Sequence, residues 1–401
     1  MLSAILEKKE RLVIGLMSGT SADGIDAALV RLTGQGLSTR IQLLAFDVLC
    51  LSPAVRERLL AAMGPAGRGN RDLCLLSSYL GELFAHACGH IAQKAGVPLA
   101  EVDLVGLHGQ TLYHHPAPEA FPGFTVTGTL QVGSAAVVAE RTGLTVVSDF
   151  RSRDMAVGGQ GAPLAPYLDF LLYHHRARGR IVLNIGGIAN ATSMLADSSL
   201  EAVRAFDTGP GNCLMDAAVT HYTGGKQTCD TDGRIALSGK IHRGLLEALL
   251  RHPYFPLPPP KSADRTTFGA DYLRAALAVA PGISPQDVVA TLTALTAQSI
   301  GTAVLEHCLQ RGRYEEMILS GGGAKNPVLV QGIRQALPKL FITDADEYDI
   351  PGKAKEAVLM AFLAHETILG RAGNVPAATG AKRPVVLGSV TPGSPKGLSG
   401  E

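Results

Sequence analysis

The chain has 401 residues, of which 46% are hydrophobic and 18% are charged, an ordinary composition for a compact globular protein. A total of 36 Lys and Arg residues against 35 Asp and Glu residues leaves a net charge of +1. This balance gives no electrostatic reason to expect a nucleic acid or a membrane as partner, and it favours a small-molecule substrate. Two domains are expected, because a single hydrophobic core stops growing at about 250–300 residues.

The N-terminal segment, MLSAILEKKERLVIGL, lacks the long apolar region and the small-residue cleavage site of a signal peptide. No run reaches the length of about 18 apolar residues that a membrane-spanning helix requires. Six cysteines are scattered without a Cys-x-x-Cys pair, which predicts reduced thiols rather than a disulfide scaffold or a zinc site. We therefore expect a cytoplasmic protein.

Apolar runs typical of strands alternate along the chain with segments of helical periodicity, which predicts an α/β fold. A basic loop at 170–180, LLYHHRARGR, precedes a new strand and marks the expected domain boundary. The proline cluster FPLPPPKS at 255–262 is expected to be an exposed loop and a candidate lid. Strands are predicted near residue 12 and at 41–49, 102–108, 144–150, 180–187 and 316–323. The predicted helices lie at 53–63, 71–95, 212–222, 238–251, 270–280, 287–311, 325–336 and 354–370.

The first loop, MSGTSADGID at 17–26, is crowded with glycines, hydroxyl groups and carboxylates. Glycines let a backbone approach a ligand closely, hydroxyl and N–H groups hold phosphate, and a carboxylate can hold the water shell of a metal. The segment contains neither the GxxxxGK[ST] phosphate loop nor the GxGxxG dinucleotide fingerprint. The alternative is a plain turn at Asp23-Gly24, although a turn does not need so many hydroxyl groups.

Two later loops follow strand-like runs. In LNIGGIANAT, Gly186 and Gly187 end a predicted strand, and a tight bend is the alternative to a ligand loop. In SGGGAKNP, three consecutive glycines would allow a flat ligand such as a purine to lie close to the backbone, and a flexible loop is the alternative.

The segment FDTGPGNCLMDAAV at 206–219 places an aspartate before the start of a predicted helix. Asn212 is a favoured N-cap residue, and a helix N-terminus attracts anions. Asp207 is a candidate general base, provided that it reaches the nucleophile. From these residues alone, it is equally possible that Asp207 only caps a turn.

The segment SDFRSRDMAVGGQGAPLAPYLD at 148–169 combines two arginines with two aspartates before a glycine-rich bend. Arginine suits the recognition of carboxylates and phosphates, and salt bridges within the segment are the alternative. His108, which follows a predicted strand, is a better candidate for a functional histidine than the adjacent pairs at 114–115 and 174–175.

In this order, GLMSGTSADGID, GLHGQT, DFRSRDMAVGGQGAPLAP, LNIGGIAN, FDTGPGN and LSGGGAKNP resemble the anhydro-N-acetylmuramic acid kinase family from about residue 12 to residue 393. The resemblance implies the fold of actin, Hsp70 chaperones and sugar kinases, in which two α/β domains flank a nucleotide cleft. It also implies a strand–turn–strand hairpin at 12–32, where the sequence pattern alone leaves strand–loop–helix open. We expect an N-terminal domain at 1–175 to which 366–393 returns, a second domain at 176–365, and a disordered tail at 394–401.

The family converts 1,6-anhydro-N-acetylmuramic acid, ATP and water into N-acetylmuramic acid 6-phosphate and ADP, a step in the recycling of peptidoglycan. The resemblance assigns the general base to Asp207 and sugar contacts to Thr111, Arg153 and Glu356, and it implies ATP and Mg²⁺ as cofactors. The metal ligands are left open. The expected nucleotide contacts are Gly19, Thr20, Ser21, Ala22, Asp23, Gly24, Ile25, Asp26, Gly186, Gly187, Gly209, Gly321, Gly322 and Gly323.

This chain departs from the family at Tyr113, where an arginine is frequent, and at His115, where an acidic residue is common, which leaves the detailed sugar contacts open. Two other functions remain alternatives, since a fold does not fix a function. One is an ordinary sugar kinase that deprotonates a hydroxyl group directly. The other is a nucleotide-switched binding protein, although nothing beyond residue 393 would supply a peptide-binding or polymer-forming region. The oligomeric state is open, with a homodimer among the alternatives.

Overall fold

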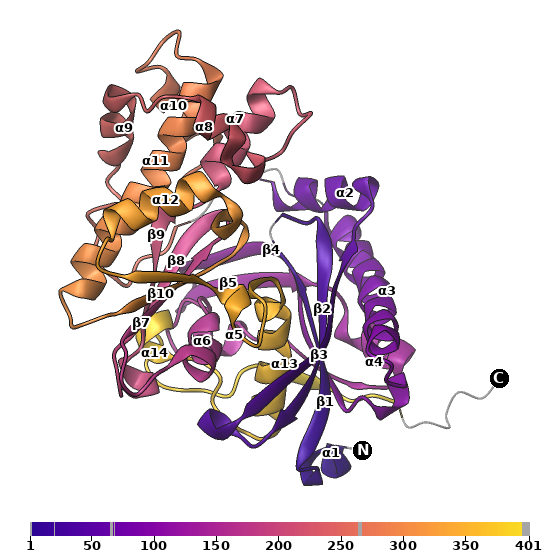
Figure 1. Ribbon diagram of the computed structural model, residues 1–401. Helices are drawn as coiled ribbons and strands as arrows, with labels where there is room; N and C mark the ends of the chain where they lie inside the picture. Colours follow the sequence, from indigo (N-terminus) through magenta and orange to yellow (C-terminus); the bar gives the residue numbers. More distant parts are fainter. Residues whose placement is uncertain (1, 20, 65–66, 68, 264–266, 395–401) are drawn as a thin grey trace. The chain divides into compact units, whose positions relative to one another are not determined.

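The computed structural model describes residues 2–19, 21–64, 67, 69–263 and 267–394, and these residues form two compact units (Figure 1). Unit 1 comprises Met1–Leu171 and Asp349–Glu401, and unit 2 comprises Leu172–Tyr348. Each unit contains a sheet with helices packed on it, so the α/β fold predicted from the sequence is confirmed. Thr20 and residues 395–401 of the expected tail lie outside the described residues.

The sheet of unit 1 has the strand order β12–β6–β4–β1–β2–β3, and β5 pairs with β4 outside this path. β4 runs parallel to both β1 and β6, whereas the other pairs are antiparallel. The strands are β1 (Glu10–Ser18), β2 (Gly24–Thr33), β3 (Arg40–Cys50), β4 (Leu104–Phe121), β5 (Phe124–Val132), β6 (Thr145–Ser148) and β12 (Ser389–Thr391). The helices that begin in this unit are α1 (Leu2–Glu7), α2 (Pro53–Met63), α3 (Asn70–Lys94), α4 (Ala135–Thr142), α5 (Ser152–Ala156), α6 (Ala165–Tyr173), α13 (Lys355–Ile368) and α14 (Pro376–Thr379).

β1 is buried on both faces, which explains why its sequence LVIGLM shows no polar alternation. Ile14 and Leu16 belong to the apolar cluster that α3 completes on one face. On the other face lies α13, so close that a Cβ atom on Gly15 would stand 1.8 Å from the main-chain oxygen of Ala357. A Cβ atom on Gly106 of β4 would likewise stand 2.1 Å from a main-chain oxygen of α13. The backbone of this late helix therefore packs directly on the first strands of the chain.

The sheet of unit 2 has the strand order β11–β10–β7–β8–β9. β10 is parallel to β7 and β11, and β8 is antiparallel to β7 and β9. The strands are β7 (Arg180–Ile185), β8 (Ile188–Met194), β9 (Arg204–Pro210), β10 (Glu316–Ser320) and β11 (Phe341–Asp344). The helices are α7 (Cys213–Tyr222), α8 (Arg234–Ser238), α9 (Arg243–Leu250), α10 (Ala270–Leu277), α11 (Pro285–Val304) and α12 (Pro327–Ala336).

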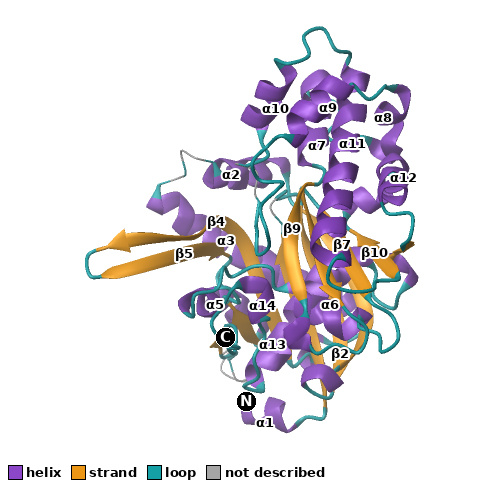
Figure 2. Ribbon diagram, turned by 90° about the vertical axis from the view of Figure 1, so that its left-hand side faces the viewer, coloured by secondary structure: helices purple, strands orange, loops and turns teal. Residues whose placement is uncertain are grey.

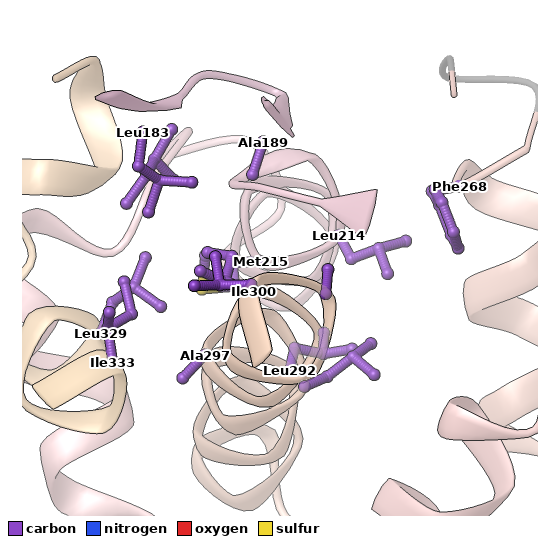
Figure 3. Packing of buried hydrophobic residues seen from close by; sticks show 14 of the residues in the cluster. Leu183, Ala189, Leu214, Met215, Phe268, Leu292, Ala297, Ile300, Leu329 and Ile333 are labelled. Carbon is purple, nitrogen blue, oxygen red and sulfur yellow. The ribbon is translucent and has the colours of Figure 1, made fainter. Parts of the chain in front are cut away.

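α11 is the central helix of unit 2. It begins after the N-cap Ser284, whose side chain accepts a hydrogen bond from the N–H of Asp287, and a π-helical turn at Leu305–Leu309 continues it. Figure 3 shows its side chains Leu292, Ala297 and Ile300 among residues of α7 and α12 in the apolar cluster. Residues 285–309 are long and apolar enough to cross a membrane by length and composition, but 78% of the most apolar window is buried inside the protein, as in a core helix.

Candidate active site

The first glycine-rich loop joins two antiparallel strands of unit 1, as the strand–turn–strand alternative implied. β1 and β2 pair as far as Met17 and Asp26, and Gly19 to Asp23 make the connection. Within it the N–H of Ala22 donates to the oxygen of Gly19 at 3.0 Å, and Ala22 has a φ of 51°. Of the predicted nucleotide residues, Gly19, Ser21, Ala22 and Asp23 thus lie in the turn, whereas Gly24, Ile25 and Asp26 open β2.

β4 holds this turn in place through a buried amide. The Ser18 hydroxyl donates to Oε1 of Gln110 at 2.7 Å, and Nε2 of Gln110 donates to the oxygen of Gly19 at 3.1 Å. Gln110 belongs to the HGQT segment, in which Thr111 was the predicted sugar contact. The structure therefore brings two of the predicted segments together by direct hydrogen bonds.

Carboxylates gather where β2 begins. Asp26 is partly buried, and burial together with the negative charges of Glu356 and Asp23 raises the pKa of its carboxyl group to about 7. Glu356 is exposed in the first turn of α13. The preceding residue, Lys355, fixes that turn by donating from Nζ to Oδ1 of the buried Asp169 at 2.9 Å. The predicted nucleotide residue Asp26 and the predicted sugar residue Glu356 are thus electrostatic neighbours.

A buried histidine and an arginine form a second polar pair in unit 1. Nδ1 of His108 lies 2.9 Å from the oxygen of Gly109, and Nε of Arg151 donates to Nε2 of His108 at 3.0 Å. A carbonyl oxygen can only accept, so Nδ1 carries the proton and the imidazole is neutral. Burial and the arginine charge lower the pKa of His108 to about 3, while burial lowers the pKa of Arg151 and the charge of Glu356 raises it. Arg151 is therefore a cation fixed by hydrogen bonds, and Glu356 is its electrostatic partner.

The structure separates the charged residues of the 148–169 segment by role. Arg153, the predicted sugar contact, is exposed on α5. Asp154 is fully buried and accepts hydrogen bonds from the N–H of Gly161, from Asn374 and from Thr379 at 2.6–2.8 Å. Asp154 therefore holds the glycine-rich bend in its fold rather than forming the salt bridge that the sequence left as an alternative.

In unit 2 two predicted glycine loops meet at Asn212. The turn of Gly186 and Gly187 between β7 and β8 accepts hydrogen bonds from the N–H groups of residues 211–213, at 2.8–3.1 Å. Asn212 precedes α7 as expected, but its side chain does not cap the helix. Its Nδ2 instead donates to the oxygen of Ile185 at 3.2 Å, and its side chain lies beside Gly322 and Gly323 of the third loop.

Apart from Gly187, the predicted glycines fall into two groups. Four are demanded by the fold, because an added Cβ atom would approach another atom to within 3.0 Å: Gly24, Gly209, Gly321 and Gly323. At three others the nearest atom to such a Cβ lies at 3.5–3.9 Å, an ordinary contact: Gly19, Gly186 and Gly322. Packing among the described residues does not explain glycine at these three positions, whereas close approach of a ligand would.

Asp207 lies in β9 opposite Asn190 of β8, and the segment after α9 surrounds it. Its Oδ2 accepts the N–H of Ala263 at 2.8 Å, its N–H donates to the oxygen of Lys261 at 3.0 Å, and its main-chain oxygen accepts the hydroxyl of Tyr254 at 2.8 Å. One carboxylate oxygen of Asp207 is thus fixed by a backbone donor, and further hydrogen bonds fix the main-chain N–H and the main-chain oxygen of the same residue.

The proline segment at 255–262 was expected to be an exposed loop, and the structure agrees at 256–258, 260 and 262 but not at Lys261. This side chain is buried, its Nζ donates to the oxygen of Phe255 at 3.0 Å, and it stands 4.9 Å from the ring centroid of Tyr254. Burial lowers the pKa of Lys261, and the charges of Glu306 and Asp207 raise it. Sequence reasoning missed Tyr254 and Lys261 as supports of Asp207, although a lone lysine after three prolines was a visible signal.

The sequence profile of the anhydro-N-acetylmuramic acid kinase family matches residues 11–393. The chain belongs to this family. A relative named anhydro-N-acetylmuramic acid kinase from Caldanaerobacter subterraneus subsp. tengcongensis is 43% identical over 389 residues, which cover 96% of this chain and 98% of the relative. One of the same name from Salinibacter ruber is 40% identical over 392 residues, covering 97% and 98%. Among solved structures, an activator of 2-hydroxyisocaproyl-CoA dehydratase from Clostridium difficile with bound ADPNP aligns over 89% of this chain and 96% of its own, with 11% identity and a TM-score of 0.43.

Membership of the anhydro-N-acetylmuramic acid kinase family confirms the resemblance seen in the motifs. The matched range contains all of the predicted site residues, from Gly19 to Glu356.

Proposed function

We propose that this chain is an ATP-dependent kinase that hydrolytically opens 1,6-anhydro-N-acetylmuramic acid and phosphorylates O6, in the recycling of peptidoglycan. The products are N-acetylmuramic acid 6-phosphate and ADP. Membership of the kinase family over 383 matched positions (residues 11–393) carries this proposal. Because the reaction consumes ATP, we place it in the cytoplasm.

Asp207 is the general base in this proposal. Its carboxylate takes a proton from water while the water oxygen bonds to the anomeric carbon, and the bond from that carbon to O6 breaks. O6 then attacks the γ-phosphorus, and the bond to the bridging oxygen of ADP breaks. The hydrogen bond from the Ala263 N–H to Oδ2 supports this role, because it fixes one carboxylate oxygen and thereby orients the other.

The nucleotide is bound by backbone groups. We assign the phosphates to the turn from Gly19 to Asp23 and to the Gly186-Gly187 turn, and the adenosine to Gly321, Gly322 and Gly323. The room for a Cβ atom at Gly19, Gly186 and Gly322 supports this assignment, since the nearest atom of the described residues to such a Cβ lies at 3.5–3.9 Å. Preorganised N–H groups are suited to the charge that develops during phosphoryl transfer.

The carboxylates around Asp26 fit a role in holding Mg²⁺. Among the described residues no cluster of three or more His, Cys, Asp or Glu side chains could hold a metal by itself. Mg²⁺ on a nucleotide needs only one or two protein carboxylates beside phosphate oxygens and water. Burial and the negative charges of Glu356 and Asp23 raise the pKa of Asp26, and a cation bound beside it would compensate that charge. Mg²⁺ would supply neutralisation of the phosphate charge.

For the sugar we keep Thr111, Arg153 and Glu356 and add Arg151. The guanidinium group of Arg151 is oriented by His108 and by the oxygen of Gly161, to which Nη1 donates at 2.8 Å. A cation so fixed suits the lactyl carboxylate of the muramic acid.

The test combines purified protein, ATP, Mg²⁺ and the anhydro sugar in ¹⁸O-labelled water, followed by mass spectrometry of the product. The proposal expects one ¹⁸O atom at the anomeric hydroxyl group and none in the phosphate. Label in the phosphate, or phosphorylation of an ordinary hexose in place of the anhydro sugar, would refute it.

Asp207→Asn tests the base in the same assay. This variant keeps the hydrogen bond from Ala263 to a side-chain oxygen, so it should bind ATP as before. Turnover should fall at least about 1000-fold, the scale on which a general base contributes. Unchanged turnover would remove Asp207 from this role.

A further inference from the structure

β4 and β5 extend from the sheet of unit 1 as a two-stranded ribbon, which Figure 2 shows running beyond the neighbouring helices of that unit. The pairing of the two strands is irregular where the ribbon leaves the sheet. Thr111 pairs with Gln131 and His114 pairs with Thr129, so three steps along β4 match two steps along β5. Residues three apart on a regular strand face opposite sides, but the extra residue of this bulge brings Thr111 and His114 to the same face.

These four residues are joined by side-chain hydrogen bonds, and we call them the ribbon hydrogen-bond chain. Nδ1 of His114 lies 3.0 Å from Oγ1 of Thr129. Nε2 of Gln131 donates to Oγ1 of Thr129 at 2.7 Å and to Oγ1 of Thr111 at 3.3 Å. One end of the chain is thus an imidazole ring, and the other end is the residue to which we assign a sugar contact.

The imidazole end of the chain is anchored to the glycine-rich bend that precedes α6. The ring of His114 hydrogen-bonds the main chain of Gln160, and Arg151 donates to the oxygen of the next residue, Gly161. The bend is itself fixed, since the N–H of Gln160 donates to the oxygen of Thr379 at 2.8 Å. The same bend therefore holds both the ribbon hydrogen-bond chain and the arginine that we assign to the lactyl carboxylate.

The partners of His114 set the direction of the hydrogen bonds in the chain. Burial and the charge of Arg151 lower the pKa of His114, so the ring is neutral at neutral pH and carries one N–H. The bond to Gln160 raises the same pKa, which identifies the main-chain group as the carbonyl oxygen that accepts this N–H. Because Nδ1 faces Thr129, the proton is on Nε2, and Nδ1 accepts the hydroxyl of Thr129.

The direction passes from Thr129 to Thr111 through an amide. The hydroxyl group of Thr129 has only one proton, so toward Gln131 its oxygen can only accept. This fixes the orientation of the Gln131 amide, with its NH₂ group toward both threonines. Oγ1 of Thr111 accepts one of these N–H groups, which leaves the hydroxyl proton of Thr111 for another acceptor. Among the described residues no other hydrogen bond involves this hydroxyl group.

We infer that the ribbon hydrogen-bond chain positions the hydroxyl group of Thr111 as a donor in the sugar site. The inference rests on the proposed function, which makes Thr111 a sugar contact. The sugar atom that meets this hydroxyl is an acceptor, and an ether, acetyl carbonyl or carboxylate oxygen, which cannot donate, suits a hydroxyl held in this way. His114, Thr129 and Gln131 are positioning residues, because they act on the sugar only through Thr111.

The experiment is steady-state kinetics of the full chain with the anhydro sugar and ATP. Thr129→Val removes the group that orients the Gln131 amide, whose oxygen can then turn and compete for the proton of Thr111. The KM for the anhydro sugar should rise about 3–10-fold, the scale of one neutral hydrogen bond, with kcat and the KM for ATP unchanged. Thr127→Val is the matched control: it is the same substitution two residues away on the same face of β5, and it should change none of these constants.

Two further variants separate positioning from a structural role. His114→Phe keeps a planar ring without its nitrogen atoms, and it should raise the KM for the anhydro sugar by a similar factor. Thr111→Val should raise this KM as well. The double variant Thr111→Val/Thr129→Val should have the KM of Thr111→Val alone, because Thr129 acts only through Thr111. Circular dichroism checks that each variant is folded.

An unchanged KM for the anhydro sugar in Thr129→Val would overturn the inference. So would additive effects in the double variant, or an equal rise of the KM in Thr127→Val. These outcomes leave the proposed function intact, since the wild type still phosphorylates the anhydro sugar. A wild type that does not act on the anhydro sugar would refute the proposed function, and with it the sugar contact from which this inference starts.

Discussion

The carboxyl group of Asp26 predicts how the stability of unit 1 depends on pH. Burial, Glu356 and Asp23 raise its pKa from 3.8 to about 7. A group with a raised pKa in the folded state favours folding at a pH below its unfolded pKa, and it loses that contribution as the pH rises through the folded pKa. Stability should therefore decrease between about pH 4 and pH 7, in the absence of nucleotide and metal.

The size of the effect follows from the shift. About three pKa units at about 1.4 kcal/mol each would give about 4 kcal/mol, and the partial exposure of the side chain reduces this to about 2 kcal/mol. Asp26→Asn removes the ionisation, so it should stabilise the protein slightly at pH 4.5 and by about 2 kcal/mol at pH 8. For a unit of roughly 200 residues this is an increase in Tm of about 4–8 °C at pH 8.

The assay is thermal unfolding followed by circular dichroism from pH 4.5 to pH 8 in EDTA without ATP. Asp47→Asn on the neighbouring strand β3 is a control of opposite sign, because hydrogen bonds from His90 and Lys94 lower the pKa of Asp47 to about 2. That variant should have a lower Tm than the wild type at both ends of the range. A difference in Tm between Asp26→Asn and the wild type that stays constant with pH would refute this reasoning, because it would show that ionisation of Asp26 does not destabilise the folded protein.

Four further substitutions separate catalysis, binding and folding. Tyr254→Phe removes the hydroxyl that donates to the main chain of Asp207, so kcat should fall about 10-fold with KM for ATP unchanged; an equal change in KM would argue for a general loss of structure. Gly322→Ala should weaken ATP binding about 10-fold at constant Tm in calorimetry, whereas Gly323→Ala should lower Tm, since its Cβ atom would lie 2.3 Å from a side-chain carbon. If both alanine variants lower Tm, the assignment of Gly322 to the ligand fails. Gly15→Ala should destabilise unit 1 by at least about 3 kcal/mol, measured by urea unfolding, and a stable variant would contradict the close packing of α13.

Elements with strong periodicity were predicted closely. The expected helix at 53–63 is α2, and that at 71–95 is α3 with a shift of one residue at each end. The expected helix at 238–251 is correct only from Arg243, because a separate short helix ends at Ser238. β8, β9, β11 and β12 were not predicted, since β8 (IANATSM) and β9 (RAFDTGP) carry small and polar residues that lack an apolar run. β5 was missed although its alternating sequence carried the signal.

The loops of the candidate site could be predicted where a short local motif marks them. Glycine density singled out the candidate loops at 17–26 and around Gly186 and Gly322, whereas the hairpin form of the first loop followed from the family resemblance. The supports of Asp207 were not predictable, because Tyr254 and Ala263 follow it by 47 and 56 positions and only the folded chain brings them together. The pairing of His108 with Arg151, 43 positions apart, has the same cause.

The direct packing of α13 on β1 and β4 sets an order for folding during synthesis. β1 and β4 leave the ribosome early, but the helix that packs against Gly15 and Gly106 emerges only after all of unit 2. Unit 2, which is continuous from Leu172 to Tyr348, can therefore fold before α13 of unit 1 has been synthesised. During that interval the glycine-lined face of the nascent sheet is open, and the synthesis of α13, rather than that of β1, decides when the first strands are covered.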